Sequence, residues 1–425
     1  MTAHRPWAFC GRQQEMQTEE TPSALIAARR MELAIADLFT VHDVTVGFSG
    51  QPQGIRLRGS LQIPSERAFP QIAARLRELG FTAWLRHDPE TGLEALLAMP
   101  GVLPQADRPR LWLHALLFGA TVLTTLYAGA GMVDGRPAND LWWPLFHFWQ
   151  GWPFSVGLLS ILLAHELGHY FVSRHHGVDR SLPYFIPLPL PDFLGNVLGT
   201  MGAVILMKAP VTNRRVMLDI GAAGPLIGMV VAIPVLLIGL SLSHVEAVPT
   251  GQAYMLEGSS LLYLVLKFFM FGRWLPGAGL DVFIHPVAFA GWAGLLVTSL
   301  NLIPAGQFDG GHIVYSILGD RARLLTWPIL LTLGALGLIF WRGWLVWAAL
   351  VFLLGQRHPG PLDGVTSLDG RRKLVAAAAL VLFALTFTPV PLSFVIPSTG
   401  QQVVVTGAMV AAGVAACFSW ARRML

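Results

Sequence analysis

The sequence predicts a polytopic α-helical membrane protein with about eight spans, a re-entrant β-like loop and a small N-terminal α+β soluble domain. Of its 425 residues, 54% are hydrophobic and only 13% are charged, whereas soluble domains carry about 25% charged residues. The mean hydropathy is +0.56. Many apolar runs approach the ~20 residues that cross a bilayer, which is the third observation behind this fold class.

The first 110 residues lack such runs. Residues 1–31 are mixed and polar and have no apolar signal-peptide core, so we expect a disordered N-terminus. Residues 32–110 predict a small soluble domain of β-α-β-β type without a cluster of potential ligands. The predicted strands are 54–63, 81–88 and 92–100, and the predicted helix is 67–79.

The apolar runs begin near Leu111 and predict a membrane-embedded core over 111–364, followed by a C-terminal helix pair in 365–425. The predicted spans are 111–132, 153–175, 216–243, 283–304, 324–341, 344–355, 373–390 and 401–421. The runs 344–355 and 259–271 are short, and the second contains Lys267, so the sequence leaves open whether either one crosses.

The charge distribution supports this count. The net charge of +4 indicates basic loops on the cytoplasmic side of a membrane rather than a nucleic-acid partner. With eight spans, every group of lysines and arginines falls on one side, together with both termini. A ninth span at 259–271 would move the later groups to the opposite side, so we expect that segment not to cross.

Residues 181–210 predict an irregular segment at membrane depth. Five prolines in the first half and glycines at 195, 199 and 202 interrupt helical hydrogen bonding. Irregular backbone at this depth must be buried in protein or line a cavity. The strand-like portion 199–208 could offer an edge to an extended peptide by β-augmentation.

The stretch HELGH places His165 and His169 four residues apart, so a helix would bring both onto one face beside Glu166. This HExxH pattern is typical of zinc hydrolases and arises by chance about 0.02 times in a chain of this composition. The alternatives are a polar cluster that binds helices together and a proton relay in a transporter. With two cysteines at opposite ends of the chain, a cysteine zinc site is excluded.

Catalytic zinc takes three protein ligands, and Asp309 is the best candidate for the third. It follows the predicted span 283–304 and stands among Pro304, Gly306, Gly310 and Gly311. An Asp-Gly dipeptide is also a common turn at a membrane exit. The HExxH pattern at the same predicted depth favours the ligand interpretation. The remaining histidines, His176 and His312 among them, are not expected to bind the metal.

HELGH in one span and NLIPAGQFDGG in a later one resemble the site-2 protease family of membrane-embedded zinc metalloproteases. The resemblance extends from about Leu111 to Gly364. GNVLGTMGAVILMKAPVTNRR, DIGAAGPLIG and the small N-terminal domain are similar to the subgroup without a PDZ domain, found in prokaryotes and chloroplasts. Phe308 departs mildly from the family, in which leucine is usual.

The resemblance implies one catalytic Zn²⁺ held by His165, His169 and Asp309, with Glu166 as general base. Asn301 matches a family asparagine and either stabilises the oxyanion or makes an interhelical hydrogen bond. The implied function is an intramembrane zinc endopeptidase that hydrolyses a peptide bond of a transmembrane protein, intact or cut beforehand, with zinc-activated water. We expect a bacterial inner membrane, in preference to a chloroplast membrane, with the site toward the cytoplasm.

Two other functions remain open at this point. A non-proteolytic scaffold of the same fold would lack the base or a ligand, and none is missing. A transporter would show inverted repeats or more intramembrane charges, and no repeat is evident. The sequence leaves the substrate, the host and the oligomeric state undefined.

Overall fold

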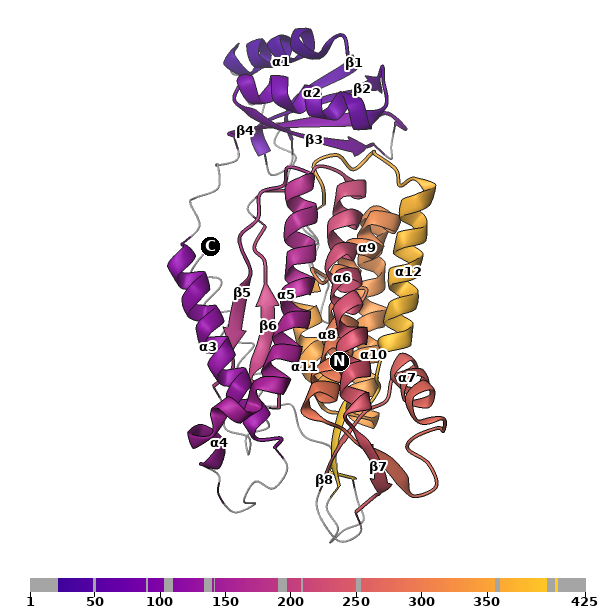
Figure 1. Cartoon of the computed structure of the whole chain (residues 1–425). Helices are drawn as coiled ribbons and strands as arrows, with labels where there is room; N and C mark the ends of the chain where they lie inside the picture. The colour runs from indigo at the N-terminus through magenta and orange to yellow at the C-terminus, as the bar shows by residue number, and fades with distance from the viewer. Residues whose placement is uncertain are drawn as a thin grey trace, which may run out of the picture. The chain divides into compact units, whose positions relative to one another are not determined.

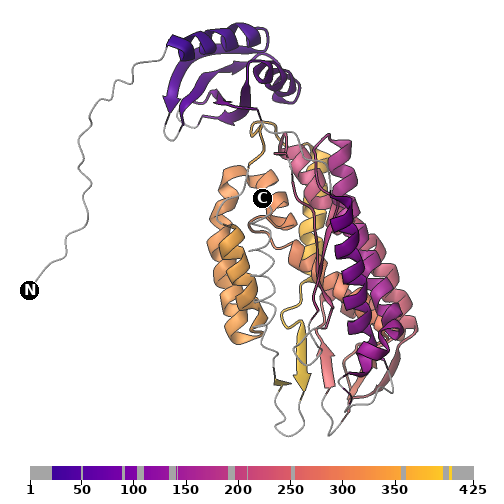
Figure 2. The same ribbon diagram turned by 90° about the vertical axis from the view of Figure 1, so that its left-hand side faces the viewer.

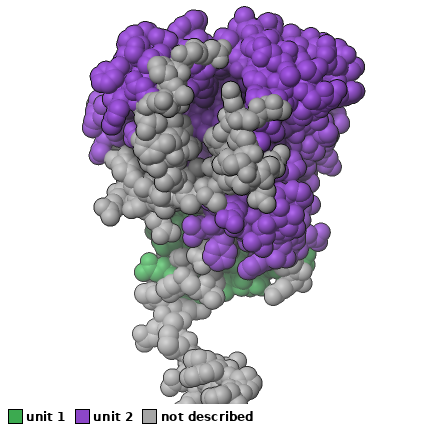
Figure 3. All heavy atoms as spheres, turned by 90° about the horizontal axis from the view of Figure 1, so that it is seen from below, with its two compact units in different colours: residues 1–104 green, residues 105–425 purple. Residues whose placement is uncertain are grey.

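The computed structural model describes most of the chain (Figure 1). The described residues are 22–48, 51–88, 91–102, 110–133, 140, 142–189, 197–207, 209–249, 254–355, 360–395 and 402–403. They divide into two compact units, residues 1–104 and 105–425, which are coloured separately in Figure 3. The division lies close to the boundary predicted near residue 110.

The N-terminal unit is a four-stranded antiparallel sheet in the order β1-β2-β4-β3, with two helices packed against it. Its elements are α1 (Pro22–Ile35), β1 (Phe39–Phe48), β2 (Gln51–Leu61), α2 (Ser65–Glu78), β3 (Phe81–His87) and β4 (Glu94–Pro100). In register, Leu57 pairs with Leu96 and Leu96 pairs with Leu85. All three are fully buried and form the centre of this unit's core.

Two features of this unit differ from the sequence prediction. Helix α1 begins at Pro22, inside the stretch expected to be disordered, and buries Ala28, Met31 and Ile35. This apolar stripe at helical spacing is narrow, and the polar residues around it hide it. Strand β1 was also missed: it is an edge strand in which apolar residues are mixed with Thr, His and Asp, and its middle faces solvent. Residues 1–21 lie outside the described residues.

The membrane unit is mainly helical. Its helices are α3 (Leu111–Ala130), α4 (Trp143–Phe146), α5 (Trp152–His175), α6 (Arg214–Ser241), α7 (Leu261–Phe271), α8 (Pro286–Asn301), α9 (Asp309–Leu318), α10 (Thr326–Ile339), α11 (Gly343–Gly355) and α12 (Gly370–Thr386), with short 3-10 helices at Phe148–Gly151 and Gly319–Leu325. Helices α5, α6 and α8 pack against one another in its centre. Phe154, Leu236 and Trp292 are among the fully buried residues there.

Short strands complete this unit. They are β5 (Tyr184–Pro187), β6 (Thr200–Val204), β7 (His244–Ala247), β8 (Tyr254–Glu257), β9 (Leu280–Phe283), β10 (Leu392–Val395) and β11 (Gln402–Val403). They form the sheets β5-β6, β7-β9 and β11-β10-β8. Helices α10 and α11 contact each other as an antiparallel pair, the orange helices in Figure 2.

Among the described residues, four helical segments are long and apolar enough to cross a bilayer: Leu111–Ala130, Phe148–His175, Arg214–Ser241 and Asp309–Ile339. The structure thus supports a membrane protein but not a count of eight spans. The predicted span 283–304 contains only the 16-residue helix α8, about 24 Å long. Protein surrounds this helix, so its length need not match the ~30 Å hydrocarbon thickness. The predicted span 401–421 lies outside the described residues except for 402 and 403.

The predicted irregular segment contains the antiparallel hairpin β5-β6, in which Tyr184 pairs with Val204 and Phe185 with Ala203. Strand β5 contacts α3, and β6 contacts α5, the helix that carries the histidine motif (Figure 1). The described structure therefore has the strand-like part beside the motif helix. Its depth in a membrane stays a prediction.

Candidate metal centre

His165, Glu166 and His169 lie in the second half of α5, and all three side chains are buried. The i, i+4 spacing places the two imidazoles on one face of the helix, where their Nε2 atoms are 3.2 Å apart. The sequence prediction that one helical face presents both histidines agrees with this geometry.

Asp309 reaches the same place from a distant part of the chain. It is the first residue of α9, and its carboxylate is only 16% exposed. The chain turns at Gly306, which has a φ of +61°. Gly310 and Gly311 follow Asp309 in the first turn of the helix, where a Cβ would lie 2.6 Å from the carbonyl oxygen of Ile303 or Ala305, respectively. The glycines therefore allow α9 to start close against the preceding loop.

The three candidate ligand atoms form a nearly equilateral triangle. Asp309 Oδ2 is 3.3 Å from His165 Nε2 and 3.2 Å from His169 Nε2, and the two nitrogens are 3.2 Å apart. Ligands at the usual ~2.0 Å from a tetrahedral zinc ion lie about 3.3 Å from each other. The donor set and its spacing therefore fit three corners of a zinc tetrahedron.

The protonation pattern of His169 also favours a cation. Its Nδ1 lies 2.7 Å from the carbonyl oxygen of Ile220 in α6, an oxygen that can only accept. A neutral imidazole that donates from Nδ1 has a lone pair on Nε2, which here faces a carboxylate oxygen and a second imidazole nitrogen. Converging lone pairs repel unless a positive charge lies between them, so this arrangement suits a metal ion.

Asn301 and Glu166 border the same centre. Asn301 ends α8, and its Nδ2 is 3.3 Å from His165 Nε2. This contact joins α8 to α5 at the candidate ligands, so it is compatible with both predicted roles of Asn301. Glu166 follows His165 directly, and its carboxylate forms no hydrogen bond or ion pair with any described residue. It is thus a buried base whose oxygens are not engaged elsewhere in the described structure.

Three glycines of helix α6, Gly221, Gly224 and Gly228, pack against the three candidate ligands. A Cβ on Gly224 would lie 2.6 Å from His169 Cε1 and closer still to Nε2. A Cβ on Gly228 would lie 3.2 Å from His165 Cβ, and one on Gly221 would lie 3.4 Å from the Asp309 carbonyl oxygen. The DIGAAGPLIG stretch thus lets the histidine rings pack directly on helical backbone, a role that the sequence alone did not indicate.

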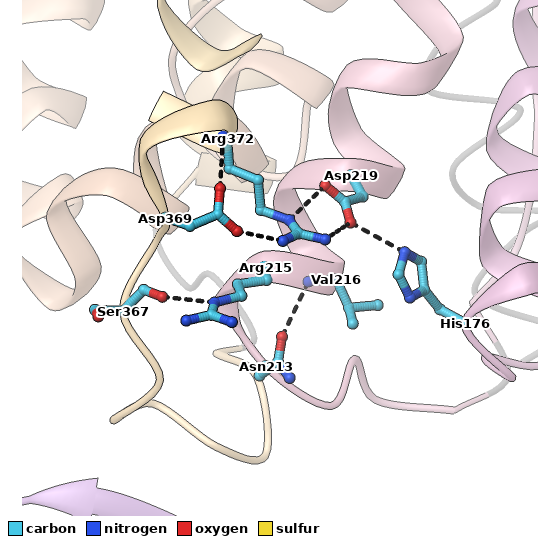
Figure 4. A network of polar contacts seen from close by, with 8 residues as sticks. All are labelled: His176, Asn213, Arg215, Val216, Asp219, Ser367, Asp369 and Arg372. Carbon is cyan, nitrogen blue, oxygen red and sulfur yellow. Dashed lines mark hydrogen bonds and ion pairs between the residues drawn. The ribbon is translucent and has the colours of Figure 1, made fainter. Parts of the chain in front are cut away.

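A polar network at the end of α5 was also missed (Figure 4). His176, which was not expected to bind the metal, has its Nε2 3.0 Å from Asp219 Oδ2. Arg372 of α12 donates to the same carboxylate from Nε and Nη2 at 2.8 and 2.7 Å. An aspartate within the apolar run of α6 was the available signal, because an ionisable residue there calls for a partner.

The comparisons with known proteins agree with this centre. Residues 153–327 match peptidase family M50. The chain is 34% identical to the probable zinc metalloprotease EGY1, chloroplastic, of Arabidopsis thaliana, over 56% of this chain and 43% of that protein. The EGY1 protein of Oryza sativa subsp. japonica is 29% identical over 80% of this chain and 64% of its own length. Arabidopsis thaliana EGY2 is 28% identical, with coverages of 83% and 63%.

The chain therefore spans between 43% and 64% of the lengths of these relatives. No solved structure matches the chain significantly. All three converging donors fall inside the segment that matches the peptidase family. Residues 153–327 thus match peptidase family M50, and the chain is similar to proteins named zinc metalloproteases.

Proposed function

We propose that this protein is an intramembrane zinc endopeptidase that hydrolyses a peptide bond of a membrane-spanning substrate. The observation that carries the proposal is the triangle of His165 Nε2, His169 Nε2 and Asp309 Oδ2, with edges of 3.2 to 3.3 Å. The match of residues 153–327 to peptidase family M50 supports it, as do relatives named zinc metalloproteases. A polar cluster that only joins helices by hydrogen bonds would not need two imidazole nitrogens and a carboxylate oxygen to point at one another.

In this proposal His165, His169 and Asp309 hold one zinc ion and leave its remaining position open to solvent or substrate. Bound zinc supplies Lewis acidity, which lowers the pKa of water and polarises a carbonyl group. The backbone carbonyl of Ile220 keeps the His169 proton on Nδ1, so that Nε2 stays available as a ligand.

Glu166 and Asn301 would perform the proton transfer and the charge stabilisation. Glu166 accepts a proton from the attacking water as the new C–O bond forms. It returns that proton to the amide nitrogen as the C–N bond breaks, so the carboxylate is regenerated. The Asn301 side-chain amide donates to the carbonyl oxygen while negative charge develops there.

The hairpin β5-β6 provides a place for the substrate beside this centre. A peptide bond in an intact helix is shielded by its own backbone, so the substrate must unwind locally before it can be attacked. Strand β6 contacts α5, and the exposed fraction of Val204 at its end is 44%. We infer that the unwound segment adds to the hairpin as an extended strand.

The membrane and the orientation belong to the proposal as well. We infer eight spans, with both termini and the metal centre near the side that carries the basic loops. The relatives are named chloroplastic, so they lend no support to the bacterial inner membrane expected from the sequence. A lipid bilayer and a transmembrane protein substrate are the partners we propose.

The direct test is cleavage of a reporter transmembrane helix in liposomes that contain the full chain and zinc. Glu166→Gln should abolish cleavage and retain bound zinc, since it removes only the base. Asp309→Ala should lose both zinc and cleavage. The matched control is Glu246→Gln, at an exposed glutamate in β7, which should cut as the wild type does.

Two results would contradict the proposal. Cleavage by the Glu166→Gln variant at the wild-type rate would remove the proposed base. Cleavage that survives a strong chelator, after zinc has been shown to be absent, would remove the metal.

A further inference from the structure

The polar network in Figure 4 lies beside the metal centre but contains none of its ligands. Its middle member is Asp219 of α6. This carboxylate is 3.0 Å from His176 Nε2 at the end of α5 and accepts two hydrogen bonds, of 2.8 and 2.7 Å, from the Arg372 guanidinium of α12. Three helices therefore meet at one carboxylate.

Asp219 directly precedes Ile220, whose carbonyl oxygen receives the Nδ1 proton of His169. His176 follows His169 by seven residues, which is about two helical turns, so both histidines face the same side of α5. Two histidines of one helix thus contact two successive residues of its neighbour. The side chain that binds Arg372 and the carbonyl that binds His169 therefore belong to adjacent residues of α6.

Arg372 holds Asp219 in a fixed geometry. Two parallel N–H donors on one carboxylate define direction as well as distance, which a single ammonium group cannot do. The guanidinium is itself restrained by Asp369, the residue that caps α12 by accepting from the Arg372 backbone N–H at 2.8 Å.

The chain that carries Arg372 is attached to the start of α6 by further contacts. The backbone N–H groups of Leu362 and Asp363 donate to the carbonyl oxygens of Val211 and Thr212 at 2.8 and 2.7 Å. Arg215 Nε donates to the Ser367 carbonyl oxygen at 2.8 Å. Residues 361–372, which lie beyond the segment 153–327 that matches the peptidase family, are thus joined to the helix behind the metal ligands.

We propose that Asp219 is a positioning residue for the metal ligand His169, and that Arg372 and His176 hold it in place. The C-terminal segment 361–372 then forms part of the support of the metal centre. This inference rests on the proposed function, because it assumes that the three converging donors bind zinc. Outer contacts that orient a metal-binding histidine typically change metal affinity 10- to 100-fold when they are lost.

A purely structural role for the network would lower stability without changing the metal site of the folded protein. The experiment therefore measures zinc affinity of the detergent-solubilised full chain by competition with a chelator, well below the melting temperature. Cobalt(II) is substituted in parallel, because its visible absorption reports the ligand geometry.

Arg372→Met should raise the zinc Kd about 10-fold and shift the cobalt spectrum, because the Asp219 carboxylate loses its directional partner. Arg372→Lys keeps the positive charge but not the two parallel N–H donors, and it should give an intermediate zinc Kd. The control is Arg321→Met, at an exposed arginine in the 3-10 helix Gly319–Leu325 that lies outside this network. Its Kd should stay within about twofold of the wild type.

Equal zinc affinity in Arg372→Met and the wild type would overturn the inference, as would equal losses in Arg372→Met and Arg321→Met. If Arg372→Met does not fold, Arg372→Lys and Asp219→Asn decide the question by the same readouts. Failure of the wild-type chain to bind zinc would instead refute the proposed function, so the two failures are distinguishable.

Discussion

At the scale of single residues, Gly224 is a position where the metal centre leaves no room for a side chain. A methyl group there would overlap the His169 ring, because its Cβ would lie 2.6 Å from Cε1. The ring must then leave the α6 backbone, and its hydrogen bond to the Ile220 carbonyl with it. The site therefore depends on a residue that has no ligand atom.

We predict that Gly224→Ala folds but binds zinc at least about 100-fold more weakly, since a ligand is displaced while overpacking costs only about 1–3 kcal/mol. Zinc titration and a melting curve check this. The control is Gly334→Ala in α10, where a Cβ would meet nothing within 4 Å. It should leave zinc binding unchanged and raise stability by about 0.5–1 kcal/mol. Wild-type zinc affinity in Gly224→Ala would contradict the role of this contact.

The sequence was sufficient to predict those candidate site residues whose polar side chains are unusual in an apolar run. His165, Glu166 and His169 were predicted from their spacing, and Asp309 from the need for a third ligand; the donor atoms of the two histidines and Asp309 lie close together in the structure. Ile220 could not be found this way, because it acts through a backbone carbonyl that every residue has. Gly224 was equally hidden, since its role is the absence of a side chain at one contact in the folded chain.

At the scale of elements, β8, α7 and β9 each contribute one buried charged residue to a cluster in the membrane unit. These residues are Glu257, Lys267 and Asp281. The Tyr263 hydroxyl donates to Glu257 Oε1 at 3.0 Å, and Lys267 Nζ lies 4.0 Å from that oxygen and 3.7 Å from Asp281 Oδ1. Burial raises the pKa of the Glu257 carboxyl to about 7, although the Lys267 ammonium acts in the opposite direction. Two carboxylates thus share one ammonium in a site shielded from water.

This raised pKa predicts a stability that falls as the pH rises. Between about pH 4.5 and about pH 7 the unfolded chain has lost the Glu257 proton and the folded chain has kept it, so the folded state binds more protons. The free energy of unfolding should then decrease by roughly 3 kcal/mol across this window and level off above it. Denaturant unfolding of the solubilised chain at a series of pH values measures the slope.

Glu257→Gln should abolish this slope and be more stable than the wild type above pH 7, because glutamine still accepts from Tyr263 and carries no charge to bury. The exposed Glu246→Gln control should keep the wild-type slope. An unchanged slope in Glu257→Gln would assign the pH dependence to another group.

Element boundaries show why the fold was only partly predictable. The motif helix and α6 were found because their apolar runs are long. Helix α8 was expected as a full span, but its ends are fixed by Pro286 at the start and by the loop after Asn301. The apolar run continues past the helix, so hydropathy alone could not place its end. Strand β1 was missed because pairing with β2, rather than an apolar pattern, defines it.

At the scale of the whole molecule, the candidate metal ligands belong to one of the two compact units. Every candidate metal ligand lies in residues 105–425. We predict that deletion of residues 1–104 leaves the zinc Kd of the remaining chain within about twofold of the full-length value, because no donor is removed. Chelator competition on the solubilised variant tests this. A loss of 10-fold or more would show that the N-terminal unit contributes to the site.

The proposed arrangement in the membrane makes a further prediction. Single cysteines are placed at the exposed positions Glu246, Arg321 and Arg342, in a chain whose Cys10 and Cys417 are replaced by serine. An impermeant reagent applied to sealed vesicles should label 246 and 342 from one side and 321 from the other, since one proposed span separates each from 321. Labelling of 321 and 342 from the same side would show that α10 does not cross.

The attachment of residues 361–372 to the start of α6 has a consequence for genetics. A nonsense mutation downstream of residue 327 would leave the whole peptidase-matching segment intact and would be classified as sparing the enzyme. A chain that ends before Arg372 nevertheless lacks the bidentate partner of Asp219. Such an allele should behave as a loss of function, whereas one that ends just after α12 would retain this contact.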